Sequence, residues 1–190
     1  ALHKWGFTLP IMQKKGFKFS NIIEVYERGG EAVEELAKEL PLYEAILNMV
    51  VDHIPNPKIA QKYRIPKLWK GDLNSDVGKS MLECDPNGPT VICVSKAIVD
   101  PHAGLVATGR VFSGTVYEGE TVYLLGAKED GKILQVSLYM GPYREIIQKV
   151  SAGNIAAVLG LEHARAGETI VDISLKGAMV PFERLRYISE

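Results

Sequence analysis

The sequence predicts a mainly β protein with a helical segment at its N-terminal end. Between residues 18 and 54, apolar side chains recur every three or four positions, which is the spacing of amphipathic helices. From residue 90 onward, short runs rich in β-branched residues alternate with Gly, Pro, Asp and Asn, as in strands joined by turns. Six such runs predict a small closed antiparallel barrel.

Three short helices are predicted for residues 18–54. The first has Ser20 as a candidate N-cap and ends at Gly29-Gly30. The second lies between these glycines and Pro41, and the third follows Pro41. His53 falls on the apolar stripe of the third helix, where a lone histidine is more often a packed core group than a ligand.

Residues 55–84 are predicted to connect the two parts. Pro55, Pro57 and Pro66, followed by a run of turn-forming residues, leave little periodicity beyond one turn of helix at residues 58–63. A Pro-rich chain is stiff, so this segment is expected to fix the angle between the helices and the strands.

The six predicted strands follow the turn signal of residues 85–89. Asp130-Gly131 is typical of a tight hairpin turn, and glycines that recur every five residues from 104 to 119 indicate bends or close backbone contacts. The strands are Thr90–Val99, Leu105–Phe112, Thr121–Leu125, Ile133–Met140, Asn154–Leu159 and Thr169–Ile173.

Composition and charge exclude several classes of protein. With 46% hydrophobic and 24% charged residues the chain is of the ordinary globular kind. A net charge of −1 argues against a protein that coats nucleic acid, so any RNA contact must be local. Cys84 and Cys93 lack the spacing of a zinc site or of a disulfide framework. No membrane span or secretory signal is recognisable, and a cytoplasmic location is expected.

No catalytic arrangement is recognisable either. Gly78-Lys79-Ser80 looks like the end of a phosphate-binding loop, but Leu73 stands where that loop needs a glycine. Asp85, Asp100 and Asp130 each sit beside Pro or Gly, where turn formation explains them. We therefore expect no catalytic residue and no metal site.

A series of short motifs resembles domain II of the translational GTPase family. They are Asp100-Pro101-His102-Ala103-Gly104, Gly109-Arg110-Val111-Phe112-Ser113-Gly114, Gly119-Glu120-Thr121-Val122, Ala152-Gly153-Asn154-Ile155-Ala156 and Ala166-Gly167-Glu168-Thr169. The stretches at residues 53–57, 60–66 and 84–89 are similar to the elongation factor 2 branch of archaea and eukaryotes. The resemblance implies a six-stranded antiparallel Greek-key β-barrel of the translation-factor domain II type.

This resemblance also implies a domain organisation. Residues 1–54 would be the C-terminal remnant of a GTP-binding domain, residues 55–84 a linker, residues 85–182 domain II, and residues 183–190 the start of the crossing to domain III. Ala1-Leu2 would be what is left of a guanine-contacting motif. The P-loop, the switches and the Asn-Lys-x-Asp motif are absent from these residues, so the chain is expected to be inactive by itself.

The function implied is that of a part of a translocase, which uses GTP and Mg²⁺ in the longer protein to move tRNA and mRNA through the ribosome. The partners implied are the small-subunit rRNA, the GTP-binding domain and domain III, with no membrane. Arg110, Ser113 and Gly114 are the candidate contacts to the ribosome or the switches. For each there is a plain structural alternative: a surface ion pair for Arg110 and a bend for Ser113-Gly114.

Two other functions stay open at this point. Flavin reductase-like enzymes also use six-stranded barrels, and barrel architecture alone implies no function; this sequence offers no charged or aromatic cluster that suggests a cofactor pocket. A spliceosomal GTPase relative would be expected to carry long acidic extensions, which the sequence does not show.

Overall fold

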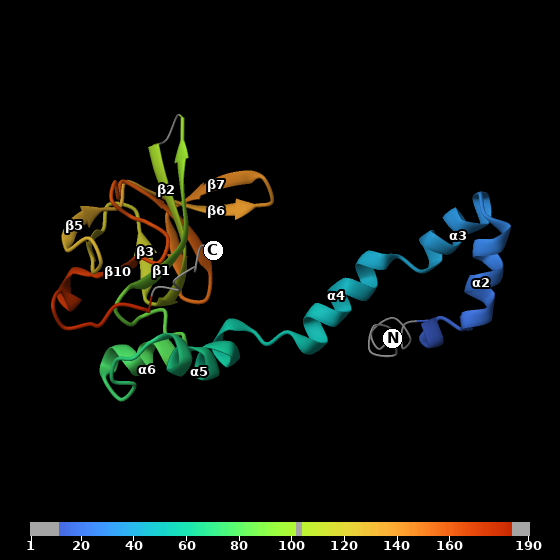
Figure 1. The fold of residues 1–190 in the computed structure, drawn as a ribbon, viewed down its shortest axis with the longest axis horizontal. Helices are drawn as coiled ribbons and strands as arrows, with labels where there is room; N and C mark the ends of the chain where they lie inside the picture. Colours follow the sequence, from blue (N-terminus) through green and yellow to red (C-terminus); the bar gives the residue numbers. More distant parts are fainter. Residues whose placement is uncertain (1–11, 102–103, 184–190) are drawn as a thin grey trace, which may run out of the picture. The chain divides into compact units, whose positions relative to one another are not determined.

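The computed structural model describes residues 12–101 and 104–183. The chain forms two compact units, residues 1–55 (unit 1) and residues 56–190 (unit 2), and each is described by itself. Together they confirm a mainly β chain with a helical N-terminal segment (Figure 1).

Unit 1 contains the three predicted helices, which are α2 (Phe19–Arg28), α3 (Glu31–Glu39) and α4 (Leu42–His53). The N-cap of α2 is Lys18 and not Ser20, which lies inside the first turn. His53 is exposed, so its predicted place in a packed stripe is wrong. None of the three helices buries a residue. Their amphipathic pattern is therefore present, but these three helices build no buried core from it.

Unit 2 begins with two helices, α5 (Pro57–Leu68) and α6 (Asp76–Glu83). The sequence predicts one helical turn here, because prolines usually interrupt helices. Pro57, however, occupies the first turn of α5, where a missing N–H costs nothing. The Asn56 side chain caps the helix by accepting a hydrogen bond from the Ile59 N–H at 3.0 Å.

Ten strands follow the helices. They are β1 (Val91–Asp100), β2 (Gly104–Ser113), β3 (Thr115–Tyr117), β4 (Thr121–Leu124), β5 (Glu129–Lys132), β6 (Gln135–Met140), β7 (Tyr143–Ile147), β8 (Lys149–Ser151), β9 (Ile155–Leu159) and β10 (Thr169–Asp172). A 3₁₀ turn, η2 (Ile173–Leu175), comes after β10. All six predicted strands are present, and β3, β5, β7 and β8 were not predicted.

The strands form an antiparallel sheet of eight in the order β5-β4-β10-β1-β2-β9-β6-β7, and β3 pairs with β8. This order leaves β5 and β7 as edges. The predicted closed six-stranded Greek-key barrel is therefore not confirmed. The pairing of β6 with β7 adds a strand that the prediction lacked, and Figure 1 shows these two strands as a hairpin that extends away from the others.

The Asp130-Gly131 pair does not form the predicted turn. Both residues lie in β5, which pairs with β4, and the connection runs through Lys128, at φ +59°. A Cβ on Gly131 would lie 2.5 Å from Leu161 Cδ2. The glycine therefore serves close packing against Leu161, which is the other common use of glycine in a strand.

Two large apolar cores hold unit 2 together, beside a small cluster of Val106, Ala157 and Leu159. One fills the space enclosed by the strands and includes Ile92, Val111, Val136 and Ile170. The other joins the strands to the helices and to the C-terminal part of the described chain. Its members include Ile65, Trp69, Met81, Phe112 and Phe182.

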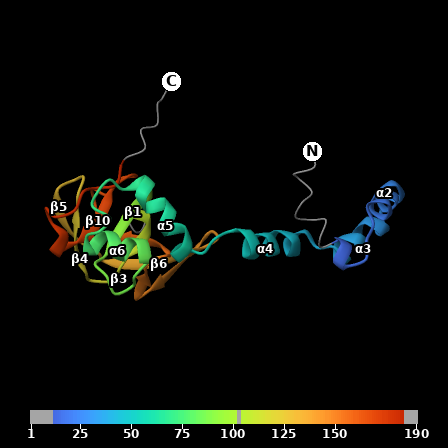
Figure 2. The same cartoon turned by 90° about the horizontal axis from the view of Figure 1, so that it is seen from below.

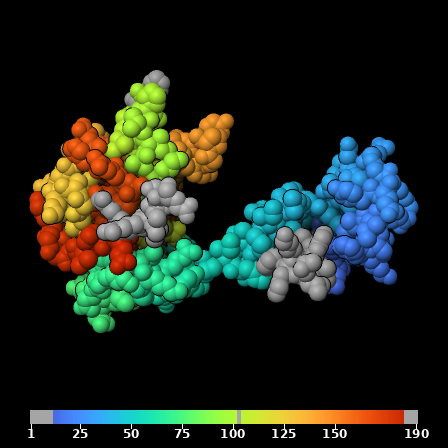
Figure 3. Space-filling model, in the orientation of Figure 1, coloured from blue at the N-terminus to red at the C-terminus, as the bar shows by residue number. Residues whose placement is uncertain are grey.

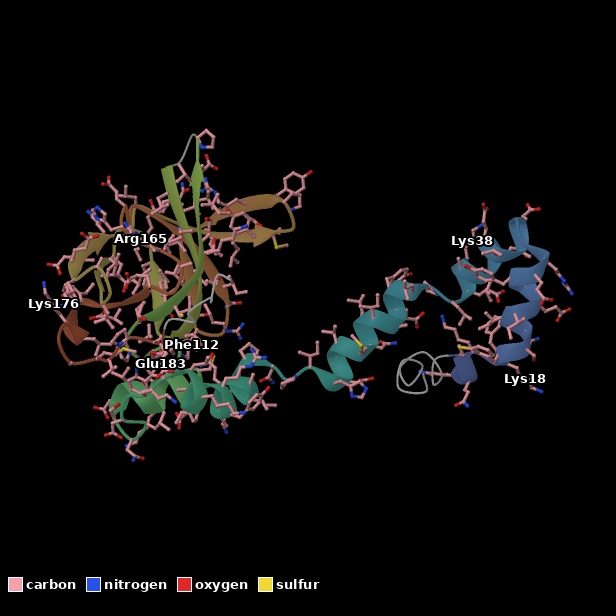
Figure 4. The ribbon with its side chains drawn as sticks, in the orientation of Figure 1. Lys18, Lys38, Phe112, Arg165, Lys176 and Glu183 are labelled. Atoms are coloured by element: carbon pink, nitrogen blue, oxygen red, sulfur yellow. The ribbon has the colours of Figure 1, made fainter. Side chains whose placement is uncertain are left out.

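Phe112 and Phe182 stack with their ring centroids 4.9 Å apart. In Figure 4, Phe112 lies where the strands meet the green helices. Figures 1 and 2 both place α5 and α6 side by side at one end of the strands, and Figure 3 shows the two helices as one continuous surface. This second core therefore fixes α5 and α6 against the strands.

In the described part of the chain, the helices are all too short or too polar to cross a lipid bilayer.

Candidate nucleic-acid interface

Arg110 lies in the middle of β2 and has a strand on each side. It pairs with Cys93 of β1 and with Ile155 of β9, so two antiparallel ladders fix its backbone. Its side chain is partly exposed, and it is in no ion pair with another residue of 12–101 or 104–183. A guanidinium held in this way can bind a phosphate through two parallel hydrogen bonds.

Ser113 and Gly114, the other two candidate contacts, are buried where β2 ends. The Ser113 hydroxyl donates a hydrogen bond to the Pro89 carbonyl. Gly114 has φ +78°, which side-chain-bearing residues rarely adopt, and a Cβ on it would lie 2.6 Å from Thr90 Cα. In this structure both residues hold a bend, and neither offers a group to a partner.

A second cation, Lys58, lies near Arg110. Burial raises the pKa of the Cys84 thiol, and the positive charges of Arg110 and then Lys58 partly oppose that rise. A Cβ on Gly153 would lie 3.0 Å from the Cys84 sulfur and 3.1 Å from Pro57 Cβ. The start of α5 and the end of α6 therefore meet beside Gly153, and the charge of Arg110 acts on the sulfur from β2.

The surface of α5 is strongly basic. Residues 53–71 contain no Asp or Glu and five Lys or Arg residues, all of them exposed: Lys58, Lys62, Arg64, Lys67 and Lys70. Within the described ranges, none of the five is in an ion pair. The sequence prediction missed this run, although counting acidic residues along the chain would have found it.

Buried contacts hold α5 in place. Gln61 is 1% exposed, and its Nε2 donates to the Phe112 carbonyl at 2.8 Å and also to the Met81 carbonyl. The Trp69 Nε1 donates to the Val180 carbonyl at 2.6 Å. Because Phe112 is two residues from Arg110 on β2, the Gln61 bond ties the basic helix to the strand that carries the arginine.

A separate polar pocket of about 340 Å³ is lined by Gly126, Ala127, Glu129, His163, Arg165 and Glu168. Glu168 is 2% exposed, and its Oε1 accepts from the Gly126 N–H at 2.6 Å and the Thr169 N–H at 3.0 Å. His163 Nδ1 lies 2.7 Å from Glu129 Oε1. These contacts explain the Ala166-Gly167-Glu168-Thr169 motif as a support for the loop after β4.

The remaining candidates divide into two groups. Ala1 and Leu2, the predicted guanine-contacting remnant, lie outside the described residues. Gly78-Lys79-Ser80 lies inside α6, where Gly78 N–H donates to the Ser75 cap, and not in a phosphate-binding loop. Among residues 12–101 and 104–183, no three His, Cys, Asp or Glu side chains gather as metal ligands would.

Comparison with known proteins shows which proteins this chain resembles. Residues 104–171 match the family model described as elongation factor Tu domain 2. All 190 residues align with proteins named elongation factor 2, at 62% identity in Staphylothermus marinus, 60% in Pyrobaculum calidifontis and 58% in Desulfurococcus amylolyticus. These alignments cover 26%, 25% and 26% of the respective relatives, so the chain spans about a quarter of their length.

Proposed function

We propose that this chain, which belongs to the elongation factor 2 family, is the ribosome-contacting segment of a translocase. In this proposal residues 1–54 end the GTP-binding domain, residues 55–84 connect it to domain II at residues 85–182, and residues 183–190 lead toward domain III. The match of residues 104–171 to elongation factor Tu domain 2 supports the assignment of domain II.

The longer protein would bind GTP and Mg²⁺ and use GTP hydrolysis for translocation of tRNA and mRNA in the cytoplasm. The present residues would supply no catalytic group. Their task would be to position the factor on the small-subunit rRNA and to connect the GTP-binding domain with domain III. The identity of 58–62% across all 190 residues supports this assignment more strongly than it supports an unrelated enzyme.

The Greek-key barrel of the domain II type is part of the same proposal. Ile133 and Leu134 connect β5 to β6, and their backbone groups bond in two directions. The Ile133 N–H donates to the Glu120 carbonyl at 2.9 Å, and the Leu134 N–H donates to the Leu159 carbonyl at 2.9 Å. These bonds bring the β4–β5 side of the sheet next to β9, which is the neighbourhood that closure needs. Slow hydrogen exchange at both amides would support closure, and fast exchange would oppose it.

Arg110 carries the proposed contact within domain II, because it is a partly exposed arginine on a fixed strand. Replacing it with Ala should weaken binding to archaeal small ribosomal subunits by about 1–2 kcal/mol and should reduce the salt slope by roughly one. Fluorescence anisotropy with the labelled chain measures both quantities across a range of KCl concentrations.

Lys149→Ala is the matched control, because Lys149 is an exposed strand cation without an ion pair among the described residues. Thermal unfolding of both variants must match that of the unchanged chain, so that a loss of fold is not read as a loss of binding. If the Arg110→Ala variant and the unchanged chain bound the small subunit equally well, Arg110 would have only a structural role.

A further inference from the structure

Positive charge is concentrated on α5 far beyond the average of the chain. The net charge of all 190 residues is −1, whereas residues 53–71 carry five cations and no acid. The rest of the chain is therefore net negative and does not attract a polyanion by long-range electrostatics. Neighbouring α6 adds one cation, Lys79, along with Asp76 and Glu83. A polyanion that binds unit 2 would therefore meet its densest group of cations on and just after α5.

The backbone of α5, which carries these cations, is held in place by buried contacts. The 12 residues of α5 span about 18 Å, and Ala60, Gln61 and Ile65 are buried along the helix. Gln61 bonds to carbonyl groups of α6 and of β2. The side chains would still lose rotamer freedom on binding, but the backbone that carries them is already fixed.

We propose that the exposed surface of α5, comprising Lys58, Lys62, Arg64 and Lys67, binds the phosphate backbone of RNA together with Lys70, which lies just beyond the end of the helix. Arg110 lies on the strand to which α5 is tied, because Gln61 of α5 donates to the carbonyl of Phe112, two residues from the arginine. This inference rests on the proposed function. There the ribosomal contact consists of Arg110, and here it also includes the basic helix α5. Tyr63, 47% exposed among these cations, is placed to stack on an unpaired base.

Two other anionic partners fit this surface less well. A helix that lies on an acidic membrane inserts its apolar face between the lipids. Of the apolar residues in this segment, Ala60, Ile65 and Trp69 are instead buried in the protein. Ile59 and Leu68 are exposed, but nine positions separate them, so they lie on opposite sides of α5 and form no common apolar face. An acidic protein would use the cations but would give Tyr63 no base to stack on. RNA can use both, since its phosphates bind the cations and an unpaired base can stack on Tyr63.

The test compares two double variants of the whole chain. Lys62→Glu with Lys67→Glu reverses two charges on α5, and Lys96→Glu with Lys149→Glu makes the same change on exposed strand positions. The probe is a fluorescein-labelled RNA hairpin with an unpaired loop, titrated between 50 and 300 mM KCl. The α5 variant should bind about tenfold more weakly or worse, with a salt slope lower by roughly two. The strand variant should keep the affinity and slope of the unchanged chain.

Three results would overturn the inference. The first is equal affinity of the α5 variant and the unchanged chain for the hairpin, and the second is an equal loss in both double variants. The third is that poly-glutamate or phosphatidylserine vesicles bind as tightly as RNA at the same ionic strength. Failure here is distinguishable from failure of the proposed function, which is judged by Arg110→Ala on small ribosomal subunits. Circular dichroism of both double variants establishes that each is folded.

Discussion

Burial decides which polar residues of unit 2 can meet a partner. Arg110 and Ser113 lie three residues apart on β2, yet the arginine is partly exposed while the Ser113 hydroxyl bonds to a carbonyl in the interior. A Ser-Gly pair at the end of a strand predicts a bend, but it does not tell which way the hydroxyl points. The sequence therefore predicted the bend correctly and could not predict that Ser113 faces inward.

Glu120 gives a prediction about pH. Burial raises the pKa of its carboxyl above the ordinary value, although the Tyr117 N–H, at 2.9 Å, donates to it and opposes the rise. The folded chain thus holds this proton more tightly than the unfolded chain. Its contribution to stability is full below the unfolded pKa and is lost as the pH rises through the folded pKa.

Glu120→Gln should therefore gain stability relative to the unchanged chain as the pH rises from about 4 to 7, since glutamine keeps the acceptor without the charge. Urea unfolding at several pH values measures this difference. Glu118→Gln is the control, because Glu118 is exposed and its substitution should show no such trend. The same pH profile for both variants would contradict the account.

The elements of unit 1 and unit 2 differ in how much they bury. The helices α2, α3 and α4 bury no residue, and they line an apolar groove of about 350 Å³ that includes Ile22, Val33, Leu36 and Leu42. The helix α5 buries Ala60, Gln61 and Ile65. Local stability follows such burial, so unit 1 should open more easily than α5 and the strands.

Limited trypsin digestion should therefore cut first after the lysines and the arginine of unit 1, and it should leave a resistant product that begins at residue 39, because no Lys or Arg lies between Lys38 and Lys58. The exposed lysines of α5 provide an internal control, since they offer cleavage sites on a helix that is packed against the strands. Mass spectrometry of the early products identifies the cuts. First cleavage at Lys62 or Lys67 would show that α5 is not held as its buried contacts indicate.

The success of sequence prediction varied among the elements for physical reasons. The three helices of unit 1 and the six predicted strands have recognisable periodic patterns. By contrast, β3 and β8 each have three residues, too few for alternation to be recognised, and β5 reads as a turn because it contains Asp130-Gly131. The helix α5 was hidden by Pro57 and Pro66, which look like helix breakers. The Asn56 cap explains Pro57 as a first-turn residue, whereas Pro66 lies inside the helix near its end.

At the scale of the whole molecule, the account predicts that the 190 residues do not bind guanine nucleotides. No phosphate-binding loop occurs in the sequence, and Gly78-Lys79-Ser80 is part of a helix. Titration calorimetry with about millimolar GDP and Mg²⁺ should give no binding heat, corresponding to an affinity weaker than about 4 kcal/mol. Tight, saturable binding would mean that Ala1-Leu2 or the α6 segment has been misinterpreted.

The net charge of the whole chain gives no indication of the basic surface of α5. A net charge of −1 argues against a protein that coats nucleic acid. The net charge does not reveal a run of five cations, because acidic residues elsewhere cancel them. The exposure of these cations depends on which side of α5 is buried. That side is set by Gln61 and Trp69, whose partners lie at Phe112 and Val180, far along the sequence. The five cations could be found in the sequence, but the fold was needed to show that their side chains are exposed.

The most direct test of the central claim is the choice between ribosomal subunits. The chain should sediment with purified archaeal small subunits at about 50 mM KCl and should be released as KCl rises toward 300 mM, because only a few phosphate contacts hold it. Large subunits at the same concentration are the comparison. We predict a clear preference for the small subunit. Equal sedimentation with both subunits, or none with the small subunit at low salt, would contradict the assignment of this chain as a small-subunit contact.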